Sequence, residues 1–368
     1  MPDDRPQPIK PEYGGAWIGA VIPGLQAVSG PTWMPEVAAA ANRVVVLVLD
    51  GLGWNMRQDN AEQLPTMAGM AGRSITCAVP STTATGLPSI TTGMTPAEHG
   101  LLGYRIGLEQ GVLNVLKWRL DGGAKGPQAT TLQPVPAFNT RSIPAVVRAE
   151  FEGTGFTKAH LAGASLHGWQ TSAVLRTRVA AALADDARVV YAYYDGIDKV
   201  AHAHGLTTPP FCAELADADR LVEELLELIP ADGALVITAD HGHVEVGPQN
   251  VVATEAVDHL VRRRSGESRF RSLYARTNKQ KDLLQACVDL YADRSWVFSR
   301  EELFDDGWLG PAGPAHHRCR IGDVVLAPFD LIGFSDPATP REDEMLSRHG
   351  SLTEDEMLVP LLAAAGRA

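Results

Sequence analysis

Three unbroken apolar runs along the chain predict buried strands. They are RVVVLVLD at 43–50, ARVVYAYYD at 187–195 and GALVITAD at 233–240. Runs of this length without polar alternation are typical of strands covered on both faces, as in a parallel sheet. Other stretches repeat apolar residues every three or four positions, which predicts helices at 142–153, 171–186 and 211–229. Alternating strands and helices predict an α/β fold with a mostly parallel central sheet and helices on both faces.

Three segments depart from this regular pattern. Residues 1–40 begin polar and rich in proline, which predicts an irregular lead-in to a single domain over 41–368. Within that domain, about 104–133 is rich in glycine and weakly periodic, as expected of a loop insertion over a site. From about 251 to 340, short strands surround a helical pattern at 279–292. This segment is predicted to form a small cap or an extension of the sheet.

Composition narrows the function classes. Hydrophobic residues make up 45% and charged residues 21% of the 368 residues, which is typical of a globular protein. The net charge of -12 disfavours binding to a nucleic-acid polymer, because that binding needs basic surface. The apolar runs are too short to span a membrane, the N-terminus lacks the pattern of a signal peptide, and the four cysteines lack zinc-site spacing. We therefore expect a cytoplasmic location, and the oligomeric state stays open.

Aspartates close the predicted strands. Asp50, Asp195 and Asp240 end the three apolar runs, and Asp198 follows shortly after the second. Ligands of open α/β sheets bind beyond the carboxyl ends of the strands, so these carboxylates are expected to converge. One such aspartate taken alone is more often a turn former or a helix cap.

Histidines near these aspartates favour a metal site. Asp198 and His202 are four residues apart and share one face if a helix begins there. Two ligand sets follow, one of Asp50, Asp240 and His241 and the other of Asp198, His202 and His349. Mixed carboxylate and imidazole ligation suits two divalent ions, with Zn²⁺ the best match and Mn²⁺ the second.

The other histidines near these motifs are expected to have supporting roles. His204 and His243 are close enough in sequence to hold the ligands in place, and His99 is expected to order a turn. His316 and His317 lie in a segment rich in proline and glycine, where we expect no ligand.

The segment VPSTTATGLPSITTG, residues 79–93, holds seven hydroxyl side chains in fifteen residues. Such a segment is usually a solvated turn or a helix cap, and the alternative is that one hydroxyl attacks a substrate. Pro88 suits a first helical turn, which predicts a helix start near Gly86 or Leu87.

Five sequence pieces, in order, resemble the type I phosphodiesterase and nucleotide pyrophosphatase family of the alkaline phosphatase superfamily. They are VVVLVLDGLGW, VPSTTATGLPSITTGMTPAEHGLLGY, DKVAHAHG, ADHG and RHGSLTEDEMLVPLL. The resemblance implies a two-metal hydrolase that cleaves phosphodiester or pyrophosphate bonds of a small molecule such as a nucleotide. It also implies a phosphothreonine intermediate on Thr83, with Thr85 as the fallback nucleophile.

The resemblance also assigns the metal ligands. Asp198, His202 and His349 would hold the first ion, and Asp50, Asp240, His241 and Thr83 the second. The chain departs from its relatives after the nucleophile, where Thr85 and Gly86 replace a proline and a phosphate-binding asparagine.

Contacts to the non-reacting part of the substrate are expected from Gly86, Trp54, Tyr104 or Arg105. For the last three the alternative is packed aromatic core and, for Arg105, a surface charge. Phosphomonoesterase or phosphonate hydrolase activity would use the same metals. A non-catalytic, metal-stabilised binding protein is the alternative from another class.

Overall fold

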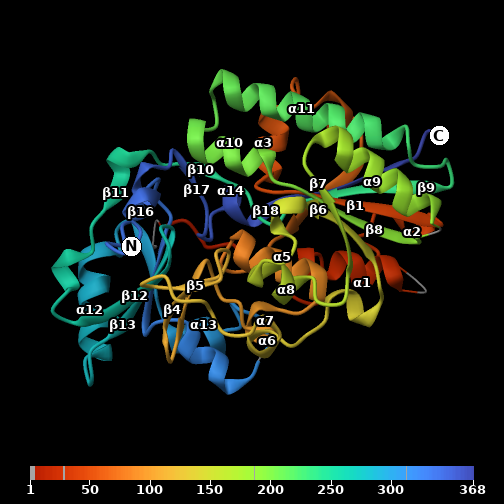
Figure 1. Ribbon diagram of the computed structural model, residues 1–368. Coiled ribbons are helices and arrows are strands. Elements are labelled where there is room, and N and C mark those ends of the chain that lie inside the picture. The colour runs from red at the N-terminus through yellow and green to blue at the C-terminus, as the bar shows by residue number, and fades with distance from the viewer. Residues whose placement is uncertain (1–4, 28–29, 186, 312) are drawn as a thin grey trace.

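A seven-stranded sheet forms the centre of the protein in a computed structural model (Figure 1), which describes residues 5–27, 30–185, 187–311 and 313–368. The strand order is β2 (Ala71–Thr76), β18 (Leu358–Ala365), β9 (Gly233–Thr238), β1 (Arg43–Leu49), β8 (Val189–Tyr194), β6 (Pro144–Arg148) and β7 (Ser165–Trp169). β1 pairs in parallel with β8 and β9, and β6 pairs in parallel with β7 and β8. β18 runs antiparallel to both of its neighbours, β2 and β9. The predicted α/β fold and its three buried strands are confirmed.

Helices cover both faces of the sheet. Figure 1 shows α9 (Ser172–Ala184), α10 (Gly196–His204) and α11 (Pro209–Leu226) on one side and α1 (Val21–Gln26), α5 (Thr83–Thr92) and α8 (Gly155–His160) on the other. Shorter helices complete the main body, namely α2 (Glu36–Ala40), α3 (Trp54–Asp59), α4 (Pro65–Ala68), α6 (Pro96–His99), α7 (Ala129–Leu132) and α14 (Glu354–Met357). The predicted helices at 171–186 and 211–229 correspond to α9 and α11.

The predicted helix at 142–153 is wrong. Residues 144–148 form β6, and only a short 3₁₀ turn, Ala149–Phe151, follows. A short apolar run does not distinguish a strand from a helix, and here parallel pairing with β7 and β8 decides the conformation.

The segment of about 251–340 folds into its own layer. A four-stranded sheet has the order β12 (Val261–Glu267), β13 (Phe270–Ala275), β15 (Val324–Pro328) and β14 (Ser295–Ser299). Helix α12 (Gln280–Tyr291) packs on it around a second apolar cluster that includes Leu283 and Phe334. Around this layer lie α13 (Arg300–Asp305), the short pairs β10 (Val244–Glu245) with β17 (Ser347–Arg348) and β11 (Val251–Val252) with β16 (Gly333–Phe334), and 3₁₀ turns at Pro248–Asn250, Glu255–Val257, Ala315–Arg320 and Pro340–Glu344.

The two remaining segments are more ordered than the sequence predicts. The insertion contains an antiparallel sheet of β3 (Arg105–Leu108), β4 (Gly111–Asn114) and β5 (Arg119–Leu120), followed by α7 and a 3₁₀ turn at Ala137–Thr140. In the lead-in, Trp17 and Ile18 are buried beside a 3₁₀ turn, Ile18–Ala20, that continues into α1. Residues 1–4 and 28–29 of the lead-in lie outside the described residues. Among the helices that the structure describes, none combines the length and apolar character needed to cross a membrane.

Candidate active site

The predicted metal ligands lie together at the carboxyl ends of the central strands. Asp50 follows β1, Asp240 and His241 follow β9, Asp198 and His202 are one turn apart on α10, and His349 follows β17. Their ligand atoms form two groups within which all atoms lie within 4.8 Å of one another, one of Asp50, Asp240 and His241 and one of Asp198, His202 and His349. The two sets read from the sequence are therefore two clusters in space.

The imidazoles of the three histidines predicted as ligands share one hydrogen-bond pattern. Each Nδ1 donates to a backbone carbonyl oxygen, at 2.8 Å from His202 to Ser347, 3.0 Å from His241 to Gly242 and 2.9 Å from His349 to Ser81. A carbonyl oxygen only accepts, so each Nδ1 carries a proton and Nε2 is the ring nitrogen left to bind a metal. Nε2 points at the carboxylates in each case, at 3.2 Å from Asp198 for His202 and 3.3 Å from Asp50 for His241. This is the orientation that metal-binding histidines adopt.

His243 is closer to the clusters than the sequence indicates. Its Nε2 lies 3.0 Å from Asp198 Oδ1, and its Nδ1 lies 3.2 Å from the Ser347 hydroxyl. Together with Asp198 and His241 it forms a third group of ligand atoms within 4.8 Å. The side chain expected to support the ligands is thus itself within reach of a metal.

Two buried carboxylates concentrate negative charge in the site, which favours binding of a cation. Asp50 and Asp240 are 2% and 0% exposed, and burial together with their mutual repulsion raises the pKa of Asp50 well above its usual range. Burial lowers the pKa of His241, but the two carboxylates outweigh it and raise that pKa to about 10. Asp240 Oδ2 accepts no hydrogen bond from the described residues. Buried carboxylates and imidazole lone pairs are a donor set that fits Zn²⁺ or Mn²⁺.

Thr83 is the hydroxyl that faces this cluster. Its Oγ1 lies 3.1 Å from His241 Nε2 and 3.5 Å from Asp50 Oδ1. Thr83 opens helix α5, because Thr82 is extended and accepts the first helical bonds from the amides of residues 85 and 86. The Thr85 hydroxyl instead donates to Leu101 O at 3.0 Å.

The predicted helix start near Gly86 or Leu87 is therefore wrong. Pro88 lies inside α5, where it leaves the Ala84 carbonyl without a helical donor. Proline favours a first helical turn, but here the extended Thr82 caps a helix that begins at Thr83, before the predicted start.

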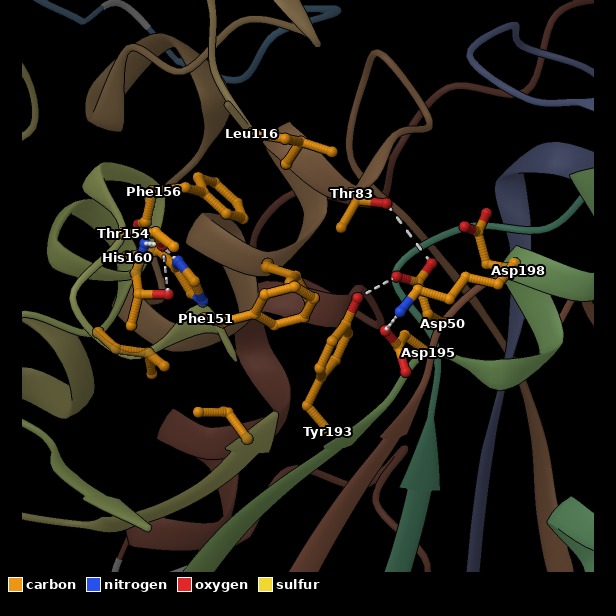
Figure 2. Close-up of a pocket in the computed structure, with 15 residues that line it drawn as sticks. Asp50, Thr83, Leu116, Phe151, Thr154, Phe156, His160, Tyr193, Asp195 and Asp198 are labelled. Carbon is orange, nitrogen blue, oxygen red and sulfur yellow. Dashed lines mark hydrogen bonds and ion pairs between the residues drawn. The ribbon is translucent and has the colours of Figure 1, made fainter. Parts of the chain in front are cut away.

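Two cavities open beside Thr83. The first, of about 180 Å³, is mostly apolar, and its lining includes Leu87, Leu116, Val147, Phe151, Phe156 and Leu161. Figure 2 shows Thr83, Asp50 and Asp198 on one side of this cavity and Phe156 and His160 on the other. The Tyr193 hydroxyl donates to Asp50 at its floor. The second cavity, of about 220 Å³, shares Thr83, Leu116 and Asp198 with the first and is otherwise more polar.

Of the expected substrate contacts, only Tyr104 lines a cavity, the polar one. Burial raises the pKa of its hydroxyl to about 12, so it stays a hydrogen-bond donor at neutral pH. Trp54 is half-buried at the start of α3, with the Arg57 guanidinium 5.6 Å from its ring centroid. Arg105 is 1% exposed and pairs with Asp336 and Asp121, so the alternative of a surface charge is wrong. The structure does not bring Trp54 or Arg105 to either cavity.

Gly86 packs against Asp240, one of the predicted metal ligands. A β-carbon at residue 86 would lie 2.8 Å from Asp240 Cβ and 2.9 Å from its carbonyl oxygen, closer than real side chains pack. The absence of a side chain, rather than a polar contact, is what this position supplies.

Gly86→Ala is expected to destabilise the protein by about 1–3 kcal/mol, because the new methyl overpacks the turn that holds Asp240. In a helix without this contact the same change stabilises by up to about 1 kcal/mol. Gly69→Ala is the control, because Gly69 caps helix α4 with helical backbone angles and its β-carbon meets atoms only at 3.6 Å or beyond. Urea unfolding of both variants measures the difference, and equal stabilities of the two would contradict the packing argument.

Comparison with known proteins defines the class. The family model of type I phosphodiesterase / nucleotide pyrophosphatase matches residues 44–352. The chain therefore belongs to this family of metal-dependent phosphoric ester hydrolases, as the sequence motifs predict. Among curated proteins, none matches the chain by sequence.

Solved structures share the fold at low identity. The chain is similar to murine ectonucleotide pyrophosphatase / phosphodiesterase 5, with a TM-score of 0.68 and 13% identity over 89% of this chain and 88% of that one. It is also similar to phosphonoacetate hydrolase from Sinorhizobium meliloti 1021, with a TM-score of 0.64 and 18% identity over 88% of this chain and 90% of that one.

Sequence reasoning missed the residues that shape the cavities. Tyr193, Phe151 and Glu267 come from three separate segments, and no local pattern distinguishes them from core or surface residues. For His243 a signal exists, because it stands two residues after a predicted ligand in ADHGH.

Proposed function

We propose that this enzyme hydrolyses small-molecule phosphodiesters or pyrophosphates through a phosphothreonine intermediate on Thr83. The observation that carries the proposal is the position of the Thr83 hydroxyl, within 3.5 Å of two cluster side chains and on the wall of two cavities. A phosphorus atom beside Thr83 then has room for a substituent on either side. That arrangement suits a diester better than a monoester.

Two divalent ions fit the donor atoms. One ion would be held by Asp50, Asp240, His241 and Thr83, and the other by Asp198, His202 and His349. His243 lies beside Asp198 and would be an alternative ligand there. Bound there, such ions supply positive charge that lowers the pKa of the attacking hydroxyl and neutralises the leaving oxygen. We propose Zn²⁺ as the better match to this set and Mn²⁺ as the second.

The protein's own groups position the reaction. Thr83 Oγ1 forms the new bond to phosphorus while the bond to the leaving alcohol breaks, and water later releases Thr83. The amides of Thr83 and Ala84 precede the first helical hydrogen bond of α5, so both can donate to a phosphate oxygen of the substrate at the helix N-terminus. Tyr193 holds Asp50 in place through its hydroxyl. Positioning of this kind supplies much of the rate in phosphoryl transfer.

The ligands bound in two of the similar structures support a small-molecule substrate. An inactive threonine-to-alanine variant of the murine protein was solved with AMP, and the hydrolase from Sinorhizobium meliloti with phosphonoacetate. A nucleotide is therefore one candidate for the natural substrate. Phosphonate hydrolysis is a competing outcome that the same residues allow.

A substrate panel with metal analysis tests the proposal. The purified protein, supplied with Zn²⁺ or Mn²⁺, is assayed on bis(p-nitrophenyl) phosphate, p-nitrophenyl phosphate, ATP and phosphonoacetate. We expect close to two metal ions per chain and a diester rate at least about tenfold above the monoester rate. A faster monoester would favour a phosphomonoesterase, and a metal-poor protein inert on every compound would favour a non-catalytic binding protein.

A further inference from the structure

The polar cavity has the lining of a specificity site. It is walled by Thr82, Tyr104, Glu267, Ser268, Glu342 and Arg348, next to the metal-binding side chains. None of these except Tyr104 is expected from the sequence to touch the substrate. The question is what kind of substituent this lining would bind.

Glu267 presents a free carboxylate oxygen. The residue ends β12, is 6% exposed, and accepts the amide of Tyr104 at 3.0 Å through Oε2. Its Oε1 accepts no hydrogen bond from the described residues. Leaving a buried acceptor unpaired costs about 1–3 kcal/mol, so a donor on the substrate would recover this free energy.

Two more polar atoms of this wall lack a partner. The Ser268 hydroxyl and Arg348 Nε are buried and unpaired among the described residues, although both belong to residues that line the cavity. The rest of the Arg348 guanidinium donates to the carbonyls of Glu342 at 2.6 Å and Met345 at 3.2 Å. The residues of this wall therefore hold one unpaired acceptor, one unpaired donor and one unpaired group that does both, each atom buried in a residue that lines the cavity.

This combination fits a hydroxyl group. A hydroxyl donates one hydrogen and accepts another, whereas an ammonium group only donates. Glu267 and Glu342 oppose an anionic substituent, such as a second phosphate. Burial raises the pKa of Glu267 to about 7 against the hydrogen bond from the Tyr104 amide, so the side chain is largely ionised at pH 8.

We propose that the substrate is a phosphodiester with one apolar or aromatic substituent in the apolar cavity and one hydroxylated alcohol in the polar cavity. Glu267 accepts the alcohol's hydroxyl hydrogen, and Arg348 or Ser268 donates to its oxygen. This inference rests on the proposed function and narrows it, because it favours diesters of a polyol or sugar over nucleoside polyphosphates. Glu267 is in this view a residue for substrate specificity.

Three p-nitrophenyl phosphodiesters test the inference, with propyl, 3-hydroxypropyl or 3-aminopropyl as the second substituent. The hydroxyl stands three carbons from the ester oxygen because at two carbons it would itself attack phosphorus and release p-nitrophenol. For the wild type at pH 8 we expect kcat/KM for the hydroxypropyl ester to exceed that for the propyl ester at least about tenfold, the value of one good hydrogen bond.

Glu267→Gln is expected to remove this preference. The Tyr104 amide requires an acceptor, so the glutamine carbonyl would take the place of Oε2 and turn its NH₂ toward the cavity. The hydroxypropyl-to-propyl ratio should fall to about 1–3, while the rate on the propyl ester changes less than about threefold. Ser268→Ala, a smaller change, should lower the same ratio, and the exposed Glu344→Gln should leave it unchanged.

The outcomes separate the two proposals. If all three esters and bis(p-nitrophenyl) phosphate are inert, the proposed function fails. If the propyl ester is hydrolysed and the ratio is near one in the wild type, or unchanged in both Glu267→Gln and Ser268→Ala, the specificity inference is overturned. A clear preference for the aminopropyl ester would overturn the assignment of a hydroxyl in favour of a cation.

Discussion

Thr83→Ala is expected to lower kcat on bis(p-nitrophenyl) phosphate at least about a thousandfold, because it removes the nucleophile itself. The substitution should leave the fold intact, since Thr83 is 8% exposed at the first position of a helix whose first bonds go to Thr82. Release of p-nitrophenol with Zn²⁺ or Mn²⁺ present measures the effect. Mass spectrometry after acid quenching should find a peptide over residues 79–93 that carries a p-nitrophenyl phosphate group in the wild type and none in the variant.

Two further variants test whether the nucleophile is Thr83 or its neighbour Thr85. Thr83→Ser keeps a hydroxyl at the same backbone position and should retain measurable turnover. Thr85→Val removes the hydroxyl that bonds Leu101 and should lower stability while leaving kcat within about tenfold, because this side chain faces away from the clusters. Turnover by Thr83→Ala above a tenth of the wild-type rate would overturn the assignment.

The candidate metal site was predictable because its residues carry local signals. Asp50 and Asp240 end strands that are apolar throughout, and Asp198 with His202 has the four-residue spacing of one helix face. Parallel strands then bring their carboxyl ends to one edge without any contact having to be known. The identity of the metals and the cytoplasmic location stay predictions.

What the sequence could not predict depends on contacts between distant segments. β6 has a helix-like period and becomes a strand through its pairing with β7 and β8. Arg105 illustrates the same limit. A lone arginine after a glycine-rich motif fits a substrate contact or a surface charge, and only the fold places Asp336, more than two hundred residues away, against it.

Arg269 and Glu356 form the most fully satisfied buried ion pair of the described residues. Both side chains are 0% exposed, and Arg269 donates to both oxygens of Glu356 at 2.8 Å and to the carbonyls of Pro328, Asp330 and Ile332. Glu356 also accepts the amide of Ser351 at 2.9 Å. The pair thus joins the β12–β13 turn of the four-stranded sheet to the segment between His349 and β18.

Arg269→Met is expected to lower the free energy of unfolding by about 3–5 kcal/mol, because it leaves a buried carboxylate without its partner. Urea unfolding with metal present measures this loss. The exposed pair of Arg318 and Asp305 is the matched control, and Arg318→Met should cost no more than about 1 kcal/mol. A loss below about 1 kcal/mol for Arg269→Met would contradict the argument.

The double variant Arg269→Met with Glu356→Gln distinguishes a buried ion pair from simple packing. Removing both charges eliminates the uncompensated carboxylate, so the double variant should be more stable than the sum of the two single losses predicts, by at least about 1 kcal/mol.

The single variant Arg269→Met should also weaken metal binding at the cluster of Asp198, His202 and His349, because Ser351, which donates to Glu356, stands two residues from His349. The double variant should recover stability without fully recovering that affinity. Such a split would show that Glu356 stabilises the fold and also positions a metal ligand.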